Sequence, residues 1–227
     1  MTRFIFLLLI LAFVSFKVQG QEANIFLSKL VAKLESVDDY SADVLIKADI
    51  PLIKILPSKA KIYFKKPDKF KVVSKGIAIL PRQGFTDMNL FLSQPEAYMV
   101  VMAGEKRIGV RDTKLLTVIA NASDSEIILV KLWVDPIDML IIESEVTTRT
   151  SGNVKVAYTY STQKKYGLPS EIQFTVDVKE FKMPKSFSSN PHKKSTQQPK
   201  KRKNGTINLS ISNYIVNQGI ADSFFVK

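Results

Sequence analysis

The chain has 227 residues, of which 45% are hydrophobic, and its formal net charge is +12. It contains no cysteine and a single histidine, His192, which excludes disulfide frameworks, cysteine nucleophiles, iron–sulfur clusters and metal sites built from several histidines. The length fits one large domain or two small ones, and these numbers favour a binding or carrier protein over an enzyme.

The N-terminus has the pattern of an export signal. Arg3 provides a positive charge, residues 4–16 are almost wholly apolar, and Val18 and Gly20 occupy the minus-three and minus-one positions of a cleavage site. This apolar run is too short for a membrane-spanning helix, which needs about 20 residues, so an uncleaved anchor is the less favoured alternative. We expect residues 1–20 to be a cleaved signal peptide. Because an exported chain without cysteine is typical of the bacterial periplasm, we expect a periplasmic protein.

One helix and several strands are predicted from the spacing of apolar residues. Apolar residues alternate with lysines at helical spacing over residues 25–34, and residues 36–39 end this helix. From Tyr40 onward the period changes to two, which is typical of an antiparallel sheet with one buried face. The predicted strands include residues 44–50, 60–64, 154–160, 172–178 and 207–211, and turns with Pro or Gly are expected at 66–69, 151–153 and 166–169.

Three segments in the middle of the chain are continuously apolar. They are residues 97–103, 114–121 and 126–135. Periodicity alone does not separate central strands from lid helices packed on both sides, so both remain open. With no internal repeat and no interdomain linker, residues 21–227 are expected to form a single domain.

Residues 182–205 differ in composition from the rest of the chain. They contain eight Lys or Arg, no acidic residue, and many Pro, Ser and Asn, which predicts a long flexible hairpin loop between two strands. Nucleic acid is not expected as a partner because the loop follows an export signal and lacks aromatic residues for base stacking. Either the loop is solvated without a partner, or it contacts an anionic membrane surface. The contacting residues would be Lys193, Lys194, Lys200, Lys201, Arg202 and Lys203.

No catalytic, cofactor-binding or metal-binding site is predicted. His192 lies in the basic loop, where a general base is not held within reach of a nucleophile. The sequence contains no nucleophile elbow, no phosphate-binding glycine loop and no paired histidines. The acidic residues Asp38, Asp39, Glu143 and Glu145 have the spacing of solvated strand edges rather than of an acid–base pair.

The apolar face of the predicted sheet needs a cover. One short helix does not cover a large curved sheet, so either the apolar middle segments or a lipid-like ligand fill the concavity. A cavity lined by Phe, Ile, Val and Leu suits acyl chains. The alternative is an ordinary packed core of sheet and helix.

Five short motifs lie in order along the chain. They are Ser36–Tyr40, Ile62–Val72 with its Lys-Lys-Pro-Asp-Lys-Phe turn, Leu132–Pro136 with its tryptophan, Gly167–Ser170, and the ending Asn213–Phe225. In sequence and order they resemble the LolA-like superfamily of periplasmic lipoprotein-sorting proteins, over nearly all of residues 24–225.

The resemblance implies an α+β fold, in which a strongly curved antiparallel sheet forms an unclosed half-barrel with helices over an apolar concavity. It implies a monomeric, non-enzymatic periplasmic carrier or binder of lipids or of the acyl chains of lipoproteins, involved in sorting to the outer membrane. The lipoprotein machinery of the inner and outer membranes would supply further partners. The alternative is a sensor or interaction protein of the same fold that docks on an anionic membrane or a protein partner without carrying cargo.

The alternating strands identify the residues expected to line the cavity. Trp133 either lines the cavity too or anchors the core, and Phe174→Asp is expected to abolish lipid binding. The family's lid-contacting arginine has three candidates, Arg107, Arg111 and Arg149. The remaining lining positions are Val44, Ile46, Ile62, Phe64, Phe70, Val72, Ile172, Phe174, Val176, Leu209 and Ile211.

Overall fold

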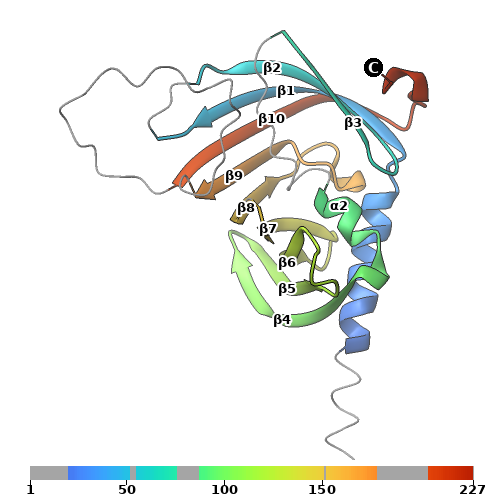
Figure 1. Cartoon of the computed structure of the whole chain (residues 1–227), viewed down its shortest axis with the longest axis vertical. Coiled ribbons are helices and arrows are strands. Elements are labelled where there is room, and N and C mark those ends of the chain that lie inside the picture. The colour runs from blue at the N-terminus through green and yellow to red at the C-terminus, as the bar shows by residue number, and fades with distance from the viewer. Residues whose placement is uncertain (1–19, 52–54, 76–86, 151, 178–203, 227) are drawn as a thin grey trace, which may run out of the picture.

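The computed structural model contains one antiparallel sheet of ten strands that curves around a helix without closing (Figure 1). It describes residues 20–51, 55–75, 87–150, 152–177 and 204–226. The strand order is β3-β2-β1-β10-β9-β8-β7-β6-β5-β4, so the last strand lies between the first and the ninth. The α+β half-barrel predicted from the sequence is confirmed.

The elements follow one another as predicted, with a helix first and strands after it. The N-terminal helix spans residues 20–35. The strands and short helices are β1 (Asp39–Asp49), β2 (Ser58–Lys65), β3 (Lys69–Ser74), α2 (Asp87–Leu92), η2 (Pro95–Ala97), β4 (Tyr98–Ile108), β5 (Arg111–Ala120), β6 (Ile127–Asp135), β7 (Leu140–Thr148), β8 (Gly152–Thr159), η3 (Lys164–Tyr166), β9 (Glu171–Asp177), β10 (Asn204–Val216) and η5 (Asp222–Phe224).

Alternation of apolar and polar residues sets the register of β1 and β10. Val44 lies opposite Ile211 and Ile46 opposite Leu209, and all four side chains are buried on the concave face. A shift of one residue would expose the whole set, so the hydrophobic pattern holds the register in place.

The three continuously apolar segments are the strands β4, β5 and β6, which decides between the two predictions. Their inward residues, such as Leu116 and Val130, are fully buried. Their outward residues are also apolar, because Met99 lies opposite Ile119 on the solvent side and both are exposed. Because these strands carry apolar residues on both faces, their sequences do not alternate between apolar and polar residues. For this reason periodicity did not identify them as strands.

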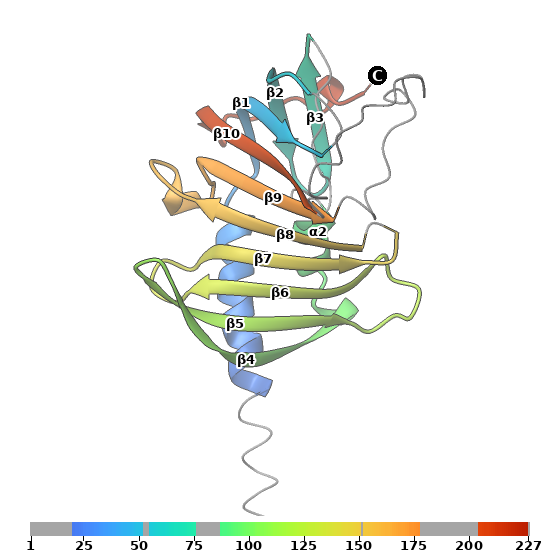
Figure 2. The ribbon, with the colours of Figure 1, turned by 90° about the vertical axis from the view of Figure 1, so that its left-hand side faces the viewer.

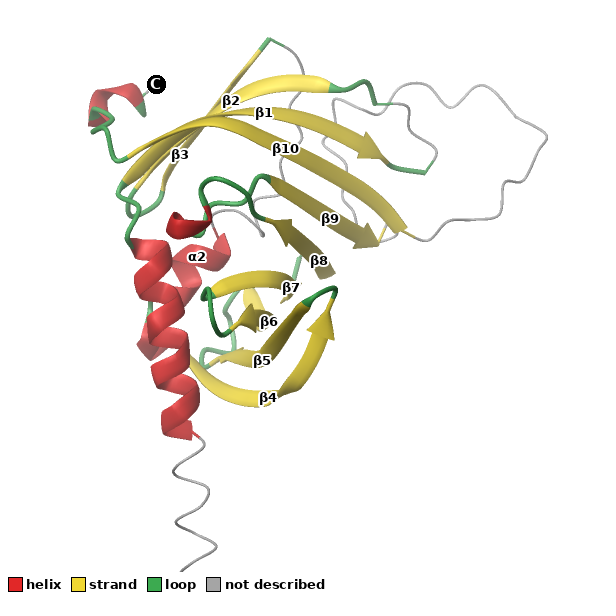
Figure 3. Ribbon diagram, turned by 180° about the vertical axis from the view of Figure 1, so that it is seen from behind, coloured by secondary structure: helices red, strands yellow, loops and turns green. Residues whose placement is uncertain are grey.

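The N-terminal helix covers one half of the sheet. Figure 2 shows β4 to β9 running across this helix, and Figures 1 and 3 show α2 beside it at one end of the strands. Ala23, Leu27 and Leu30 of the helix pack with α2 and with β4 to β7 in a first core cluster. A second cluster joins β1, β2, β8, β9 and β10, and Tyr158 packs against both clusters. Two separate core clusters therefore pack against the concave face of the sheet.

The chain reverses after β10 into a segment that we call the C-terminal strap, residues 217–226. Asn217 has a left-handed φ of 55°, and its side-chain oxygen accepts a hydrogen bond of 2.8 Å from the backbone of Asp38. The backbone N–H groups of Gln218 and Gly219 donate to the carboxylate of Asp39 at 3.1 and 3.0 Å. Asp39 is only 4% exposed. The expectation that it is a solvated edge residue was wrong, because the strap covers and binds it.

The strap then lies against β2 and β3. The ring of Phe224 is 4.5 Å from that of Tyr63, and the carbonyl of Phe224 accepts a hydrogen bond of 2.5 Å from Lys71 Nζ. Asp222 forms ion pairs with Lys65 at 2.6 Å and Lys69 at 2.9 Å. These two lysines flank the turn between β2 and β3, so the strap fixes the hairpin from outside.

Titration of Asp222 tests this attachment. Hydrogen bonds from Lys65 and Lys69 lower the pKa of Asp222 to about 2. Because the pKa is lowered on folding, the ion pairs contribute above the ordinary carboxylate pKa and are lost as the pH falls towards 2. The carboxyl carbon of Asp222, followed by NMR, should titrate near pH 2. In the double variant Lys65→Met/Lys69→Met the midpoint should move up towards 3.8. A midpoint near 3.8 in the unmodified protein would contradict the attachment.

Candidate functional site: a pocket at the end of the half-barrel

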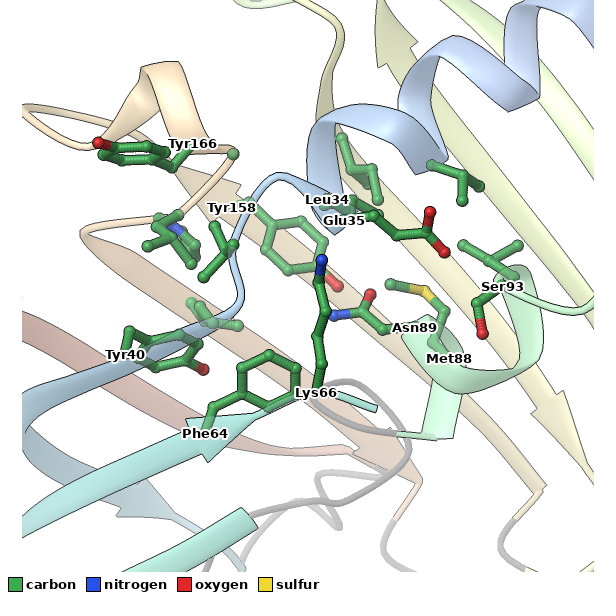
Figure 4. Close-up of a pocket in the computed structure, with 18 of the residues that line it drawn as sticks. Leu34, Glu35, Tyr40, Phe64, Lys66, Met88, Asn89, Ser93, Tyr158 and Tyr166 are labelled. Carbon is green, nitrogen blue, oxygen red and sulfur yellow. The ribbon is translucent and has the colours of Figure 1, made fainter. Parts of the chain in front are cut away.

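A cavity of about 290 Å³ lies between the two core clusters, at the C-terminal end of the N-terminal helix (Figure 4). This volume is at the lower end of the range of small-molecule pockets, about 300–1,000 Å³. The helix, α2, the β2–β3 turn, the η3–β9 connection and the adjacent strand ends form its wall. The lining residues are Val31, Leu34, Glu35, Val37, Tyr40, Phe64, Lys66, Pro67, Met88, Asn89, Leu92, Ser93, Ile141, Tyr158, Tyr160, Tyr166, Gly167, Leu168, Pro169, Ile172 and Tyr214.

Most of the wall is apolar because each element turns its hydrophobic side inward. Leu34 continues the apolar stripe of the N-terminal helix, Leu92 ends α2, and Ile172 belongs to the inward face of β9. Gly167 has a left-handed φ of 68°, and a Cβ there would lie 3.4 Å from Cδ2 of Leu34. That distance is ordinary van der Waals contact, so glycine is favoured here by the left-handed φ, which turns the chain into the η3–β9 connection that completes the wall.

Five tyrosines line the pocket, and three of their hydroxyl groups are bound to the protein itself. Tyr160 donates to the carbonyl of Ile141 at 2.7 Å, and Tyr214 donates to that of Pro169 at 2.8 Å. The hydroxyl of Tyr158 lies 3.1 Å from Ser144 Oγ. Burial raises the pKa of Tyr158 to about 12, and the bond to Ser144 opposes part of this shift. Tyr158 is therefore uncharged at neutral pH.

Charged and polar side chains gather on one side of the pocket. Figure 4 shows Lys66, Asn89, Glu35 and Ser93 near the end of the helix and α2. The ammonium of Lys66 lies 2.9 Å from a carboxylate oxygen of Asp38. The pocket thus combines an apolar interior with a polar side, which is the arrangement that amphiphilic ligands require.

An ionic cluster beside the pocket holds the helix against the β6–β7 turn. Arg111 bonds the carboxylates of Asp135 and Asp138, and Lys164 lies 3.2 Å from Asp138. Hydrogen bonds from Arg111 and Lys164 lower the pKa of Asp138. Lys33 Nζ, on the helix, donates to the backbone carbonyl of Asp138 at 2.5 Å. Burial lowers the pKa of Lys33, and the nearby Asp138 opposes that shift.

The residues predicted to line the cavity are divided between the pocket and the core. Phe64 and Ile172 line the pocket. Phe70 and Val72 pack against the second core cluster. The backbone of Val176 pairs with Val154 and Gly205, but its side chain lies outside the description. Ile172 also belongs to the second core cluster, together with six other predicted residues: Val44, Ile46, Ile62, Phe174, Leu209 and Ile211.

Trp133 lies on the opposite face of the sheet from the pocket. Its neighbours Leu132 and Val134 are fully buried in the first core cluster, so Trp133 points outward. Lys106 Nζ lies 4.2 Å above its ring and forms an ion pair of 2.7 Å with Glu143 on the adjacent strand. Trp133 therefore neither lines the pocket nor belongs to a core cluster, in contrast to both expectations.

None of the three candidate arginines is among the residues that line the pocket. Arg111 belongs to the ionic cluster, Arg149 bonds the backbone carbonyls of Ser123 and Ser125, and Arg107 lies 4.0 Å from Asp112 on the surface. The cations expected to contact an anionic surface, Lys193, Lys194, Lys200, Lys201, Arg202 and Lys203, lie outside the described residues, as do His192 and residues 1–19.

Several lining residues were missed from the sequence for different reasons. Tyr158 and Tyr160 belong to the strand predicted over residues 154–160, but they were not predicted to line the cavity. Leu34 belongs to the predicted apolar stripe of the helix, and this stripe was the available signal. Met88 and Leu92 come from α2, whose six residues are too few to show a helical period.

Comparisons with known proteins identify the fold. No family model matches the sequence, and no curated protein matches it. A structure titled as a putative outer membrane lipoprotein-sorting protein domain from Vibrio parahaemolyticus is similar, with a TM-score of 0.61 and 12% identity over 91% of this chain and 97% of that chain.

Two further solved structures have a similar fold. A DUF1329 family protein from Desulfovibrio piger has a TM-score of 0.59 and 12% identity, over 91% of this chain and 97% of its own. A LolA superfamily protein from Nitrosomonas europaea has a TM-score of 0.52 and 13% identity, over 88% of this chain and 97% of its own. The chain therefore has the LolA-like fold predicted from its motifs.

Two other properties of the described residues bear on the class of protein. None of the helices among them has the length and apolar character needed to cross a membrane. Within the same ranges, no three His, Cys, Asp or Glu side chains are grouped as a metal site would require.

Proposed function

We propose that this protein is a non-enzymatic periplasmic carrier or binder of lipids or of the acyl chains of lipoproteins, and that it takes part in lipoprotein sorting to the outer membrane. In this proposal residues 1–20 are a signal peptide that is removed on export. The observation that carries it is the largely apolar pocket at the end of the half-barrel. An acyl chain offers apolar area and few hydrogen bonds, and this pocket offers the same.

Two further observations support the proposal. The fold is similar to that of the putative outer membrane lipoprotein-sorting protein domain from Vibrio parahaemolyticus. The pocket wall also has separable parts, because α2 and the N-terminal helix pack against the sheet through side chains rather than through its hydrogen-bonded ladder. Small shifts of these two helices would widen the pocket without breaking a strand pair.

A charge placed in the pocket tests the proposal. Leu168 is half-buried, lines the pocket, and lies in the η3–β9 connection rather than in a strand. Leu168→Asp should weaken binding of the neutral dye N-phenyl-1-naphthylamine by about tenfold or more, because the ligand would bury an unpaired carboxylate. Dye fluorescence titration measures this.

Leu45→Asp is the matched control. Leu45 is also half-buried, but its neighbours Val44 and Ile46 point inward, so Leu45 lies on the outer face of β1. This variant should bind the dye as the unmodified protein does, with circular dichroism confirming that both variants fold. Native mass spectrometry of the protein purified gently from a bacterial periplasm would then identify a bound lipid or acylated peptide. Equal dye binding by both variants would place the ligand elsewhere.

A further inference from the structure

Tyr40 lines the pocket, and its hydroxyl group has no hydrogen-bond partner in the part of the chain that the structure describes. Tyr40 is only 8% exposed, and its ring stacks on Phe64 at 5.3 Å and meets the edge of Tyr214 at 5.7 Å. Within the described ranges no residue accepts from or donates to this hydroxyl. The other buried tyrosine hydroxyls of the pocket, those of Tyr158, Tyr160 and Tyr214, all have partners.

The Tyr40 hydroxyl is accessible from the cavity. Among the described residues, the side-chain polar atom that is both sealed from solvent and unpartnered is Oδ1 of Asn153. Since Tyr40 also lacks a partner but is not sealed, its hydroxyl reaches open space, and Tyr40 is a lining residue. Figure 4 shows this hydroxyl directed towards the side of the pocket where Phe64 and Lys66 lie.

An unpartnered hydroxyl in an apolar pocket is costly unless a ligand satisfies it. Buried polar groups are paired in nearly all native structures, and one that opens into a cavity is satisfied there by water or by a ligand. Burial raises the pKa of Tyr40, so the group remains a protonated donor throughout the physiological range. The matching ligand atom is an acceptor, and in an acyl compound that atom is a carbonyl or carboxylate oxygen.

The volume of the pocket restricts the ligand further. About 290 Å³ is small for a ligand pocket, so it holds a single chain rather than the several chains of a fully acylated anchor. We infer that this pocket binds one acyl chain, and that Tyr40 donates a hydrogen bond to the carbonyl oxygen of its acid, ester or amide group. This inference rests on the proposed function and adds the ligand class and the residue that selects it.

Tyr40→Phe tests the inference because it removes only the hydroxyl. Affinities for dodecanoic acid, methyl dodecanoate and dodecane are measured by displacement of N-phenyl-1-naphthylamine. Loss of one neutral hydrogen bond should weaken binding of the ester by about three- to tenfold, and binding of the acid, which is a carboxylate at neutral pH, should weaken by at least as much. Binding of dodecane and of the dye should not change, since neither carries a carbonyl group. The melting temperature of the free variant should be unchanged or higher, because a hydroxyl without a partner has been removed.

Tyr166→Phe is the matched control. Tyr166 lines the same pocket, but Figure 4 shows its hydroxyl directed away from the cavity, so its loss should alter none of the affinities. If Tyr40→Phe loses affinity for both the acid and the ester, the hydrogen bond is made to the carbonyl oxygen that the two compounds share. If it loses affinity for the acid alone, the ligand class is restricted to free fatty acids.

The outcomes separate the two proposals. If the dye and dodecane bind the unmodified protein but Tyr40→Phe leaves the ratio of ester to dodecane affinity unchanged, the role of Tyr40 is overturned and the apolar pocket stands. If neither the dye nor any dodecyl compound binds the unmodified protein, the proposed function fails and the inference fails with it.

Discussion

Replacing Phe174 with Ala should lower the free energy of unfolding by about 3–5 kcal/mol. Phe174 on β9 is fully buried in the second core cluster, opposite Ile207 on β10 and Val156 on β8. Truncation leaves a cavity that three adjacent strands cannot close without breaking their register. Chemical denaturation followed by circular dichroism measures the change.

Phe64→Ala is the matched control for Phe174→Ala. Phe64 lies on β2, is half-buried and faces the pocket, so its truncation enlarges an existing space rather than opening a new one. We expect this variant to lower the free energy of unfolding by about 1–2 kcal/mol, because the side chain of Phe64 is only partly buried. Similar costs for the two variants would contradict the division between core and pocket. Phe174→Asp should abolish lipid binding by unfolding the domain, so this variant does not test the cavity.

Arg111→Met should destabilise the protein by about 3 kcal/mol, because it leaves the carboxylate of Asp135 buried without its counter-ion. Asp135 is 5% exposed, and its other oxygen accepts hydrogen bonds from the backbone of Ile137 at 2.8 Å and Asp138 at 3.3 Å. The backbone bonds hold the carboxylate in place, so it cannot turn out to solvent. Asp138 keeps its contact with Lys164, so the cost arises mainly at Asp135.

Two further variants separate charge from packing at this cluster. The double variant Arg111→Met/Asp135→Asn removes both charges and should recover a large part of the lost stability. Arg107→Met removes an exposed arginine whose pairing distance to Asp112 is 4.0 Å, and it should change stability by less than about 0.5 kcal/mol. If the double variant is less stable than Arg111→Met alone, Asp135 does not carry an uncompensated charge.

The sequence by itself determined which face of several strands is buried. Alternation of apolar and polar residues in β1, β8, β9 and β10, interrupted in β1 by Leu45, predicted which side of each strand is buried, since one face of an antiparallel strand meets the core and the other meets water. The helical spacing over residues 25–34 predicted the N-terminal helix, and Pro67 and Gly167 marked turns. The order of the five motifs predicted the half-barrel. The curvature of the sheet could not be predicted from periodicity.

The tertiary structure alone decided which inward-facing residues form the core and which form the pocket. Phe64 and Phe174 have the same residue type and the same alternation, but one lies at the end of β2 beside the helix and the other in the middle of β9. Alternation gives the face of a residue but not its depth along the barrel. Depth depends on where the N-terminal helix and α2 pack.

The same limit applies to the polar groups. Asp39 and Asp135 are buried because segments distant in sequence, the strap and Arg111, cover and bind them. The Tyr40 hydroxyl has no partner among the described residues because the strands around it bring Phe64 and Tyr214, rather than an acceptor, against its ring. A single sequence records which side chains are polar, but hydrogen bonding is satisfied in three dimensions, so only the folded chain shows which polar group is left for a ligand.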